Sequence, residues 1–382
     1  MIQTKYVIVG AGFYGAVFAE RIATVLGQRV TLIDRRSHLG GNSASAIDPA
    51  TGIECHTYGS HIFHTSNERV WKYLQAFTAF TSYQHKVYIQ YDGRVYTMPI
   101  NLKTVNDYFG LNLRPHEVFD FLAKEIAAEG IGEPQNLEEK AISLIGRKLY
   151  EAFIRGYTLK QWNKDPKELP ASIITRLPVR TCYNNNYFND PHQGVPLDGY
   201  LKIFDRMLRH PNIEIALNTP LQSLLRDIPK GCTVIYTGML DELFDYQLGM
   251  LEWRSLRFEW ETRGVADYQG TTVMNYGDLE IPFTRIHEFK HYHPERQEVF
   301  NSHQTIICKE FSRDYTKHQE AYYPVNTPQN MKLYQDYVNL FRTHYPRWRV
   351  GGRLGAYQYW DMDKAIDQAL IDFDNMTKEE KL

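Results

Sequence analysis

The segment that most constrains the fold lies close to the N-terminus. Residues 7–15 read VIVGAGFYG, an apolar run that leads into three glycines with the spacing G-x-G-x-x-G. Gly10 permits a tight turn, Gly12 lets a pyrophosphate approach the backbone, and Gly15 allows a helix to pack closely on the strand. The pattern therefore predicts a dinucleotide at the start of a helix, where unpaired N–H groups and the helix dipole stabilise phosphate.

The residues around this turn predict a βαβ unit. Tyr6 to Gly10 form an apolar strand, Ala16 to Leu26 show helical spacing, and Arg29 to Asp34 form a second strand. Asp34 stands 19 positions after Gly15, close to the spacing of about 20 at which a carboxylate accepts hydrogen bonds from ribose hydroxyls. An aspartate at this position favours a ribose without a 2′-phosphate.

Three further segments favour FAD over NAD as the dinucleotide. After Asp34 and five more residues the chain continues with Gly40, Gly41 and Asn42, which resembles the flavoprotein signature D/E-x5-G-G. The stretch TVIYTG resembles the strand that closes many FAD sites, and GGRLG before a helix resembles the segment that receives the flavin ring. Because these signals follow one another in the expected order, FAD is the predicted cofactor.

Length and pattern together predict several domains. The 382 residues exceed what one hydrophobic core usually fills. We expect an α/β fold in which a Rossmann-like FAD-binding domain carries an inserted helical bundle and an antiparallel β-sheet domain. The last residues, NMTKEEKL, are expected to form a charged, fraying tail. The predicted limits are 1–82 with 197–240 and 346–382 for the discontinuous FAD-binding domain, 99–178 for the bundle, and 83–98 with 179–196 and 241–330 for the sheet domain.

The composition argues against several classes of partner. A formal net charge of −2, from 43 basic and 45 acidic residues, provides no field that would hold nucleic acid or an anionic membrane. An anionic ligand would therefore have to meet individually placed arginines. The four cysteines are scattered without a C-x-x-C pair, which is typical of reduced thiols. Without a basic leader or a membrane-spanning apolar run, the chain is expected to be cytoplasmic.

Two residue types leave alternatives open. The 27 tyrosines and 6 tryptophans suit the stacking of bases, but a tyrosine-rich core would explain them as well. His56, His61 and His64 are spaced H-x4-H-x2-H, which suggests metal binding. No carboxylate or thiolate stands at a recognised partner spacing, so we expect no metal site.

Seven longer stretches are unusual enough to compare with known families: YGSHIFHT, GYTLKQW, LPASIITRLPVR, NNNYFND, PFTRI, YYPV and YQYWDMD. Together they resemble bacterial UDP-galactopyranose mutase, and the resemblance runs from the first glycine loop to the final helix. It implies the interconversion of UDP-galactopyranose and UDP-galactofuranose without net redox change. It also implies that reduced FAD acts as a covalent nucleophile at the anomeric carbon.

The resemblance implies a set of substrate-binding residues. Arg176 and Arg285 match two arginines that bind the diphosphate, and a guanidinium can form two parallel bonds to phosphate oxygens. Arg176 belongs to a predicted mobile loop at about residues 165–178, which would close over the substrate. The other matching residues are Tyr187, Tyr323 and Tyr359 for the diphosphate, Tyr157, Phe153, Thr158 and Trp162 for the nucleotide, and His85 for the sugar, where some relatives carry Asn.

The resemblance also implies the cofactor-binding residues. His61 matches a histidine beside the flavin and, with Arg176 and Arg285, completes the predicted catalytic residues; the role of His64 stays open. Asp361 precedes the last helix, where it can act as N-cap while the positive helix end faces the flavin. The predicted cofactor-binding residues are Gly10, Gly12, Phe13, Gly15, Asp34, Arg35, Gly40, Gly41, Asn42, His61, Arg353, Tyr359, Asp361 and Met362.

Two other functions are compatible with parts of the sequence. An FAD-dependent oxidoreductase of the amine-oxidase-like type would share the glycine signatures and would consume an electron acceptor. A non-catalytic nucleotide sensor would bind UDP and FAD without converting UDP-galactofuranose. For the mutase, the expected partners are the two UDP-sugars, a cellular reductant such as NAD(P)H, and further copies of the chain in a dimer or larger homo-oligomer.

Overall fold

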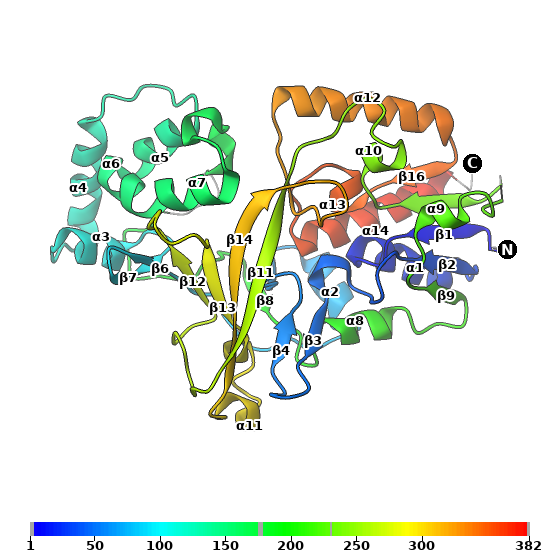
Figure 1. The fold of residues 1–382 in the computed structure, drawn as a ribbon, viewed down its shortest axis with the longest axis horizontal. Coiled ribbons are helices and arrows are strands. Elements are labelled where there is room, and N and C mark those ends of the chain that lie inside the picture. Colours follow the sequence, from blue (N-terminus) through cyan, green and yellow to red (C-terminus); the bar gives the residue numbers. More distant parts are fainter. Residues whose placement is uncertain (1–3, 175–178, 230, 380–382) are drawn as a thin grey trace.

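The computed structural model describes residues 4–174, 179–229 and 231–379. Figure 1 shows three parts: an α/β part that contains β1 and α14, a helical part on the opposite side, and a long sheet between them. The sheet joins the two outer parts, so residues from all three parts can reach a common site.

The α/β part is built on a five-stranded parallel sheet with the strand order β16-β10-β1-β2-β9. Tyr6 of the central strand lies opposite Val30 on one side and Thr233 on the other. Strands from distant segments of the chain therefore meet in one sheet. They are β1 (Tyr6–Val9), β2 (Val30–Ile33), β9 (Ile213–Ala216), β10 (Thr233–Tyr236) and β16 (Trp348–Val350).

Helices cover both faces of this sheet, as a parallel sheet requires. Successive side chains of a strand point to opposite faces, so Leu32 and Ile235 enter one core while Ile33 and Tyr236 enter the other. The helices of the first core are α1 (Phe13–Val25), α2 (Glu68–Gln75), α8 (Tyr200–Met207) and α14 (Met362–Glu379). The helices of the second core are α9 (Leu221–Leu224), α10 (Leu240–Leu243), α12 (Pro328–His344) and α13 (Gly352–Gly355).

The predicted βαβ unit is confirmed, with one shift at the start of its helix. The spacing of apolar residues predicted a helix from Ala16, but α1 begins at Phe13. The chain becomes helical directly after Gly12, which is extended with φ −76° and ψ −179° and occupies the N-cap position. The amide groups of the first helical turn therefore lie within the glycine motif itself.

The segment from Asn375 to Glu379 is more ordered than predicted. The expected fraying tail began at Asn375, but α14 continues to Glu379. Met376 is fully buried in the same core as Ile366 and Phe373. The apolar face of the helix thus continues into the charged segment and holds it on the α/β part.

The seven-stranded sheet is mixed, which corrects the prediction of an antiparallel sheet. Its order is β15-β11-β14-β13-β12-β6-β7, and β12 pairs with β6 in parallel. Each of these two strands forms an antiparallel hairpin on its other side, and no short turn links the two, so nothing imposes an antiparallel direction. The strands are β6 (Val87–Tyr91), β7 (Arg94–Met98), β11 (Trp253–Arg263), β12 (Val273–Tyr276), β13 (Arg285–Glu288), β14 (Thr305–Asp314) and β15 (Tyr323–Pro324).

The helical part packs around one apolar core. Asn101 and Asn136 cap two of its helices by accepting hydrogen bonds from backbone N–H groups. A π-helical turn at Glu151–Arg155 connects α6 to α7. The helices are α3 (Leu102–Phe109), α4 (Pro115–Ala127), α5 (Leu137–Ile145), α6 (Arg147–Tyr150) and α7 (Gly156–Trp162).

Lys160 is one of several residues that fasten α7 to the seven-stranded sheet. The Nζ of Lys160 donates hydrogen bonds to the carbonyl oxygens of Tyr276, Asp278, Ile281 and Phe283 at 2.8 to 3.2 Å. Burial lowers the pKa of Lys160 to about 8. The carbonyls run from the last residue of β12 to the loop before β13, so this contact holds α7 against the connection between these two strands.

Shorter elements complete the connections. Among residues 4–174, 179–229 and 231–379, no helix combines the length and apolar composition needed to cross a membrane. The shorter elements are β3 (Ser45–Ile47), β4 (Glu54–His56), β5 (Phe63–Thr65), β8 (His192–Gly194), α11 (Gln297–Phe300) and the 3-10 turns Gly41–Ser43, Pro166–Glu168, Ala171–Ile173 and Phe289–Tyr292.

The α/β fold class with a Rossmann-like sheet is confirmed, whereas the residue limits of the predicted domains stay predictions. Two observations bear on them. The β6–β7 hairpin contributes Val87 and Met98 to the core of the helical part. Helix α12 lies mainly outside the predicted segments, and its Tyr337 and Phe341 pack on the parallel sheet.

Gly15→Ala tests the close approach of α1 to β1. A Cβ atom at Gly15 would lie 2.0 Å from the carbonyl oxygen of Gly10, so helix and turn would have to separate. We expect a loss of about 1 to 3 kcal/mol in the free energy of unfolding, measured by urea denaturation. Gly132→Ala is the control, because a Cβ atom there would have no heavy atom within 4 Å; equal stability of the two variants would contradict the argument.

Candidate active site

A cavity of about 1070 Å³ lies where the glycine turn, the helical part and the seven-stranded sheet meet. It brings together the predicted site residues that the structure describes, while their individual roles stay predictions. Arg176 lies outside the described residues. The cavity is lined by Gly10, Gly12, Phe13, Gly15, Asp34, Arg35, Gly40, Gly41, Asn42, His61, His64, His85, Phe153, Tyr157, Thr158, Trp162, Tyr187, Arg285, Tyr323, Arg353, Tyr359, Asp361 and Met362.

One end of the cavity is formed by the glycine turn and Asp34. The carboxylate of Asp34 accepts hydrogen bonds from the backbone N–H groups of Ala11 at 2.7 Å and Arg36 at 2.8 Å. It therefore ties the end of β2 to the glycine turn, and each oxygen retains a further lone pair. This geometry fits a carboxylate that both holds the turn and accepts a bond from a ribose hydroxyl.

Arg36 lines this end of the cavity and was missed by the sequence analysis, which selected its neighbour Arg35. The side chain of Arg36 is 14% exposed, against 42% for Arg35. Arg36 donates hydrogen bonds to Asn42 and Glu320, and its guanidinium lies 4.5 Å from the centre of the Tyr58 ring. The sequence DRRSH offers two adjacent arginines, and only the folded structure shows which one is more deeply buried.

His61 presents a neutral imidazole to the cavity. Its Nδ1 lies 2.7 Å from the carbonyl oxygen of Gly59, and a carbonyl can only accept, so Nδ1 carries the proton. Burial lowers the pKa of His61 to about 4, despite that hydrogen bond. Its Nε2 is therefore the unprotonated nitrogen near neutral pH and can accept a hydrogen bond.

The C-terminal segment contributes Arg353 and the start of α14. Arg353 donates to the carbonyl oxygen of Ala321 at 3.2 Å, and burial lowers its pKa. Asp361 directly precedes α14, which begins at Met362. The positive end of an 18-residue helix and a buried guanidinium thus border the same cavity.

Arg285 and Tyr157 meet across the boundary between sheet and helical part. The guanidinium of Arg285 donates a hydrogen bond to the hydroxyl of Tyr157 and lies 5.6 Å from the centre of its ring. On its other side, Arg285 Nε lies 3.4 Å from the carboxylate of Glu310. Burial raises the pKa of Tyr157, although Arg285 opposes this effect, so the phenol keeps its proton.

Three further tyrosines line the cavity with protonated hydroxyls. Tyr323 and Tyr359 stack at 5.4 Å between ring centres with an angle of 19°. Burial raises the pKa values of Tyr323 and Tyr187. Neutral phenols can donate hydrogen bonds to phosphate oxygens, so this wall suits an anionic group.

The helical wall combines lining residues with core residues. Phe153 lies in the π-helical turn and packs edge-on against Tyr96 at 5.0 Å between ring centres. Thr158 is buried, and Trp162 packs against the core of the helical part. Phe153 therefore serves the core as well as the cavity, and a helical spacing alone could not separate these two roles.

His64 and His85 stack on the same aromatic ring. The ring centre of His64 lies 3.6 Å from that of Phe188, and its Nδ1 lies 2.6 Å from a carboxylate oxygen of Asp190. His85 lies 5.6 Å from the Phe188 ring and contacts the Tyr83 hydroxyl at 3.0 Å through Nδ1. Burial lowers the pKa of His85 to about 3, which keeps this imidazole neutral.

The cavity therefore has two chemically different ends. The first joins Asp34, the glycine turn and Arg36, and it suits the ribose and pyrophosphate of a dinucleotide. The second joins Arg285 with protonated tyrosines and aromatic faces, and it suits a second anionic group beside flat rings. Glu310, His287 and Ser60 beneath Arg285 were missed by the sequence analysis, because no motif spacing links residues on separate strands.

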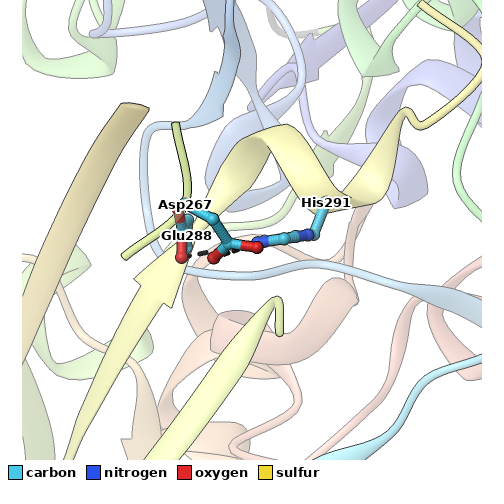
Figure 2. A group of neighbouring side chains, drawn as sticks. All are labelled: Asp267, Glu288 and His291. Atoms are coloured by element: carbon cyan, nitrogen blue, oxygen red, sulfur yellow. Dashed lines mark hydrogen bonds and ion pairs between the residues drawn. The ribbon is translucent and has the colours of Figure 1, made fainter. Parts of the chain in front are cut away.

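A separate group outside the cavity resembles a metal site but is explained by ion pairing. Figure 2 shows Asp267, Glu288 and His291, whose ligand atoms lie within 4.8 Å of one another. The Glu288 carboxylate already accepts from the backbone N–H groups of Tyr268 and Gln269. His291 Nε2 lies between the two carboxylates, at 3.3 and 3.4 Å, so a protonated imidazole supplies the positive charge.

Comparisons with known proteins identify the family. A family described as UDP-galactopyranose mutase matches residues 152–359, and an NAD(P)-binding Rossmann-like domain matches residues 8–77. A probable UDP-galactopyranose mutase from Klebsiella pneumoniae is 43% identical over 371 residues, covering 97% of this chain and 94% of the relative. The chain belongs to the UDP-galactopyranose mutase family. The predicted family and enzyme class, an isomerase, are thereby confirmed.

Two further relatives of this chain differ in the substrates for which they are named. A UDP-galactopyranose mutase from Mycoplasma pneumoniae is 32% identical, covering 96% of this chain and 94% of the relative. A dTDP-fucopyranose mutase from Escherichia coli is 38% identical, covering 96% of this chain and 97% of the relative. Two relatives that are about equally similar to this chain are therefore named for different nucleotides and different sugars.

The solved structures agree on the fold. A crystal structure of reduced UDP-galactopyranose mutase superposes with a TM-score of 0.73 at 16% identity, covering 99% of this chain and 94% of the other. A putative protoporphyrinogen oxidase from Exiguobacterium gives 0.67 at 14% identity, covering 99% and 100%. Because a mutase and a putative oxidase share this architecture, the fold alone does not determine the reaction.

The His291 ion pair predicts a pH-dependent stability. Burial lowers the pKa of His291, but the hydrogen bond and charge of Glu288, assisted by Asp267, outweigh burial and raise it. Because the pKa of His291 is higher in the folded than in the unfolded protein, its protonation stabilises the fold. The stabilisation is complete at pH values below the unfolded-state pKa of about 6.5, and it is lost as the pH rises through the folded-state pKa. We expect His291→Gln to cost on the order of 1 kcal/mol near pH 5.5 and much less near pH 9.

Thermal unfolding at these two pH values measures the difference. His303→Gln provides the control, because His303 is exposed. A His291→Gln penalty that is the same at both pH values would contradict the assignment of a protonated imidazole.

Proposed function

We propose that this chain interconverts UDP-galactopyranose and UDP-galactofuranose with reduced FAD and without net redox change. The observation that carries the proposal is the cavity, in which a dinucleotide-binding turn at one end faces an arginine–tyrosine wall at the other. The overall similarity to family members agrees with this arrangement. An enzyme that only oxidised a small molecule would have no use for the second anion-binding wall.

The residues of the chain fit FAD as the proposed cofactor. Asp34 and the glycine turn suit the ribose and pyrophosphate, and Gly40 with Gly41 lets backbone approach a bulky group closely: a Cβ at Gly41 would lie 3.1 Å from the Gly12 Cα. Arg353 and the positive end of α14 would favour negative charge on a reduced flavin. The remaining proposed contacts are Gly10, Gly12, Phe13, Gly15, Arg35, Arg36, Asn42, His61, Tyr359, Asp361 and Met362.

Reduced flavin, when bound, supplies a nucleophilic ring nitrogen for the anomeric carbon of the sugar. The protein provides binding, orientation and electrostatics. Arg285 would bind the departing diphosphate through charge-assisted hydrogen bonds, and the protonated hydroxyls of Tyr187 and Tyr323 would donate further ones. Because these groups are fixed before the substrate binds, they would stabilise the leaving group with little reorganisation.

Other residues would orient the nucleotide and the sugar. Tyr157, Phe153 and Trp162 offer aromatic surface for the base, and Thr158 lies beside them on α7. His85, held neutral by burial, would contact the sugar. His61 would accept a hydrogen bond through Nε2, either from the flavin or from a sugar hydroxyl.

The segment at about residues 165–178 is proposed to close over the substrate and to add Arg176 to the diphosphate site. Closure would exclude water while the sugar is detached from UDP. We further propose a cytoplasmic, homo-oligomeric enzyme that draws electrons from a cellular reductant such as NAD(P)H.

The decisive experiment is a turnover assay with the purified FAD-loaded protein reduced by dithionite. Chromatography of the nucleotide sugars should show UDP-galactofuranose converted to UDP-galactopyranose, without consumption of oxygen or another acceptor. Stoichiometric acceptor consumption would favour the oxidoreductase, and binding of UDP and FAD without conversion would favour a sensor. A parallel assay with dTDP-fucopyranose tests the activity named for the Escherichia coli relative.

Arg285→Ala should lower kcat/KM by about ten- to a hundredfold, which corresponds to one charge-assisted phosphate contact of roughly 1.5 to 3 kcal/mol. Arg176→Ala should give a similar or larger loss if loop closure depends on it. Arg257→Ala is the control, because this half-exposed arginine lies on the same sheet over the Phe311 ring. Full activity of both Arg285→Ala and Arg176→Ala would refute the phosphate assignment.

A further inference from the structure

A chain of buried polar contacts runs beneath the second end of the cavity. Ser60 Oγ lies 2.6 Å from His287 Nδ1, and His287 Nε2 lies 2.9 Å from Glu310 Oε2. The other carboxylate oxygen of Glu310 lies 3.4 Å from Arg285 Nε. Ser60 thus connects to the guanidinium of Arg285 through two side chains.

These side chains lie together because of the strand register. Arg285 of β13 is directly opposite Glu310 of β14, and His287 lies two residues further along β13 on the same face. Ser60 comes from the segment between β4 and β5, next to His61. The contacts therefore join the seven-stranded sheet to the turn that presents His61.

Burial makes each contact costly to lose. His287 is 0% exposed and Glu310 is 2% exposed. A buried carboxylate that loses its cationic partner keeps an unpaired charge in a region of low polarity. In the described part of the chain, Arg285 is paired with no carboxylate other than Glu310.

The proton positions follow from the partners. Burial lowers the pKa of His287, although Glu310 opposes this, so the ring carries a single proton. Burial alone would raise the pKa of Glu310, but Arg285 and His287 outweigh it and lower it to about 2. The carboxylate accepts from His287 Nε2–H, and His287 Nδ1 accepts from the hydroxyl of Ser60.

The contacts of Arg285 leave part of its guanidinium able to donate hydrogen bonds to a ligand. Glu310 approaches the Nε side, and Tyr157 accepts from one terminal nitrogen. At 3.4 Å the Nε contact is an ion pair rather than a well-formed hydrogen bond. The carboxylate thus holds the guanidinium from its Nε side and leaves the Nη1 group to donate to a phosphate.

We propose that Glu310 and His287 are positioning residues, which hold the Arg285 guanidinium toward the cavity and, through Ser60, at a set place relative to His61. This inference rests on the proposed function, because it concerns the arginine assigned to the diphosphate. His287 orients the carboxylate, and the carboxylate orients the guanidinium. Neither residue touches the reacting atoms.

The test compares Glu310→Gln with Glu288→Gln. Glu288 is 0% exposed and lies on the same sheet, and its carboxylate accepts from backbone N–H groups outside the cavity. It therefore matches Glu310 in burial and charge. Two readouts are used: KM and kcat for the UDP-sugar with reduced enzyme, and the Kd of UDP for the oxidised protein by calorimetry.

We expect Glu310→Gln to raise the Kd of UDP by about tenfold and to lower kcat/KM by at least the same factor, because a displaced Arg285 would also stabilise the departing diphosphate less well. Glu288→Gln should lower the thermal midpoint but leave the Kd within about twofold. His287→Gln should give a smaller rise in Kd, because it leaves the charge of Glu310 in place. Equal Kd values for Glu310→Gln and the wild type would overturn the proposal.

A double mutant separates positioning from general destabilisation. In an Arg285→Ala background, Glu310→Gln should raise the Kd no further, because the group that it positions is gone. Additive losses would overturn the proposal. If Glu310→Gln does not fold, Glu310→Asp keeps the charge, shortens the side chain and should also raise the Kd; an unchanged value would count against the proposal.

The Kd measurements also separate this inference from the proposed function. A wild-type protein that binds UDP but converts neither UDP-galactofuranose nor dTDP-fucopyranose would refute the mutase reaction. The comparison of Kd values would still decide whether Glu310 and His287 position Arg285.

Discussion

The close approach of α1 to β1 is the constraint on which the rest of the site depends. No side chain fits between Gly15 and the carbonyl of Gly10, so the helix begins immediately above the end of the central strand. Parallel strands on both sides bring Asp34 and the start of α13 to the same edge of the sheet. Ligands of open α/β sheets bind at this edge, where helix N-termini converge, and the other two parts of the molecule are built around it.

Placement of those two parts relies on a few buried polar contacts rather than on one continuous apolar core. Lys160 binds four carbonyl groups and holds α7 against the segment before β13. Ser60 and His287 connect β13 to the turn before β5. The direction of such contacts is fixed by hydrogen-bond geometry, whereas hydrophobic attraction has no preferred direction. This explains how parts of the molecule with separate hydrophobic cores can keep Tyr157, Arg285 and His61 around one cavity.

Local patterns were enough to predict the βαβ unit and the helical part, because glycine spacing and apolar periodicity are short-range signals. The residues of the arginine–tyrosine wall were predicted only through the resemblance to the family, since periodicity alone would place Phe153, Tyr157 and Trp162 in a core. Three features were predicted wrongly: where α1 begins, how β12 runs relative to β6, and whether the C-terminal segment is helical. Each of them depends on packing between distant segments. Arg36 could not be separated from Arg35 by sequence. Glu310 and His287 carry no motif, and only the register of two strands brings them to Arg285.

The near-zero net charge of the chain shapes how it can bind an anion. Without a long-range field, attraction must come from a few guanidinium groups, and a buried guanidinium needs acceptors beside it, either a carboxylate or, as at Arg353, a backbone carbonyl. Arg285 has Glu310 and Arg36 has Glu320. In each pair the carboxylate reduces the positive charge that attracts an anionic ligand, but it also fixes the direction in which the guanidinium N–H groups point. Because phosphate binding depends on two parallel bonds as well as on charge, orientation outweighs the lost attraction. A loose arginine in this cavity would therefore bind a diphosphate less well than a paired one.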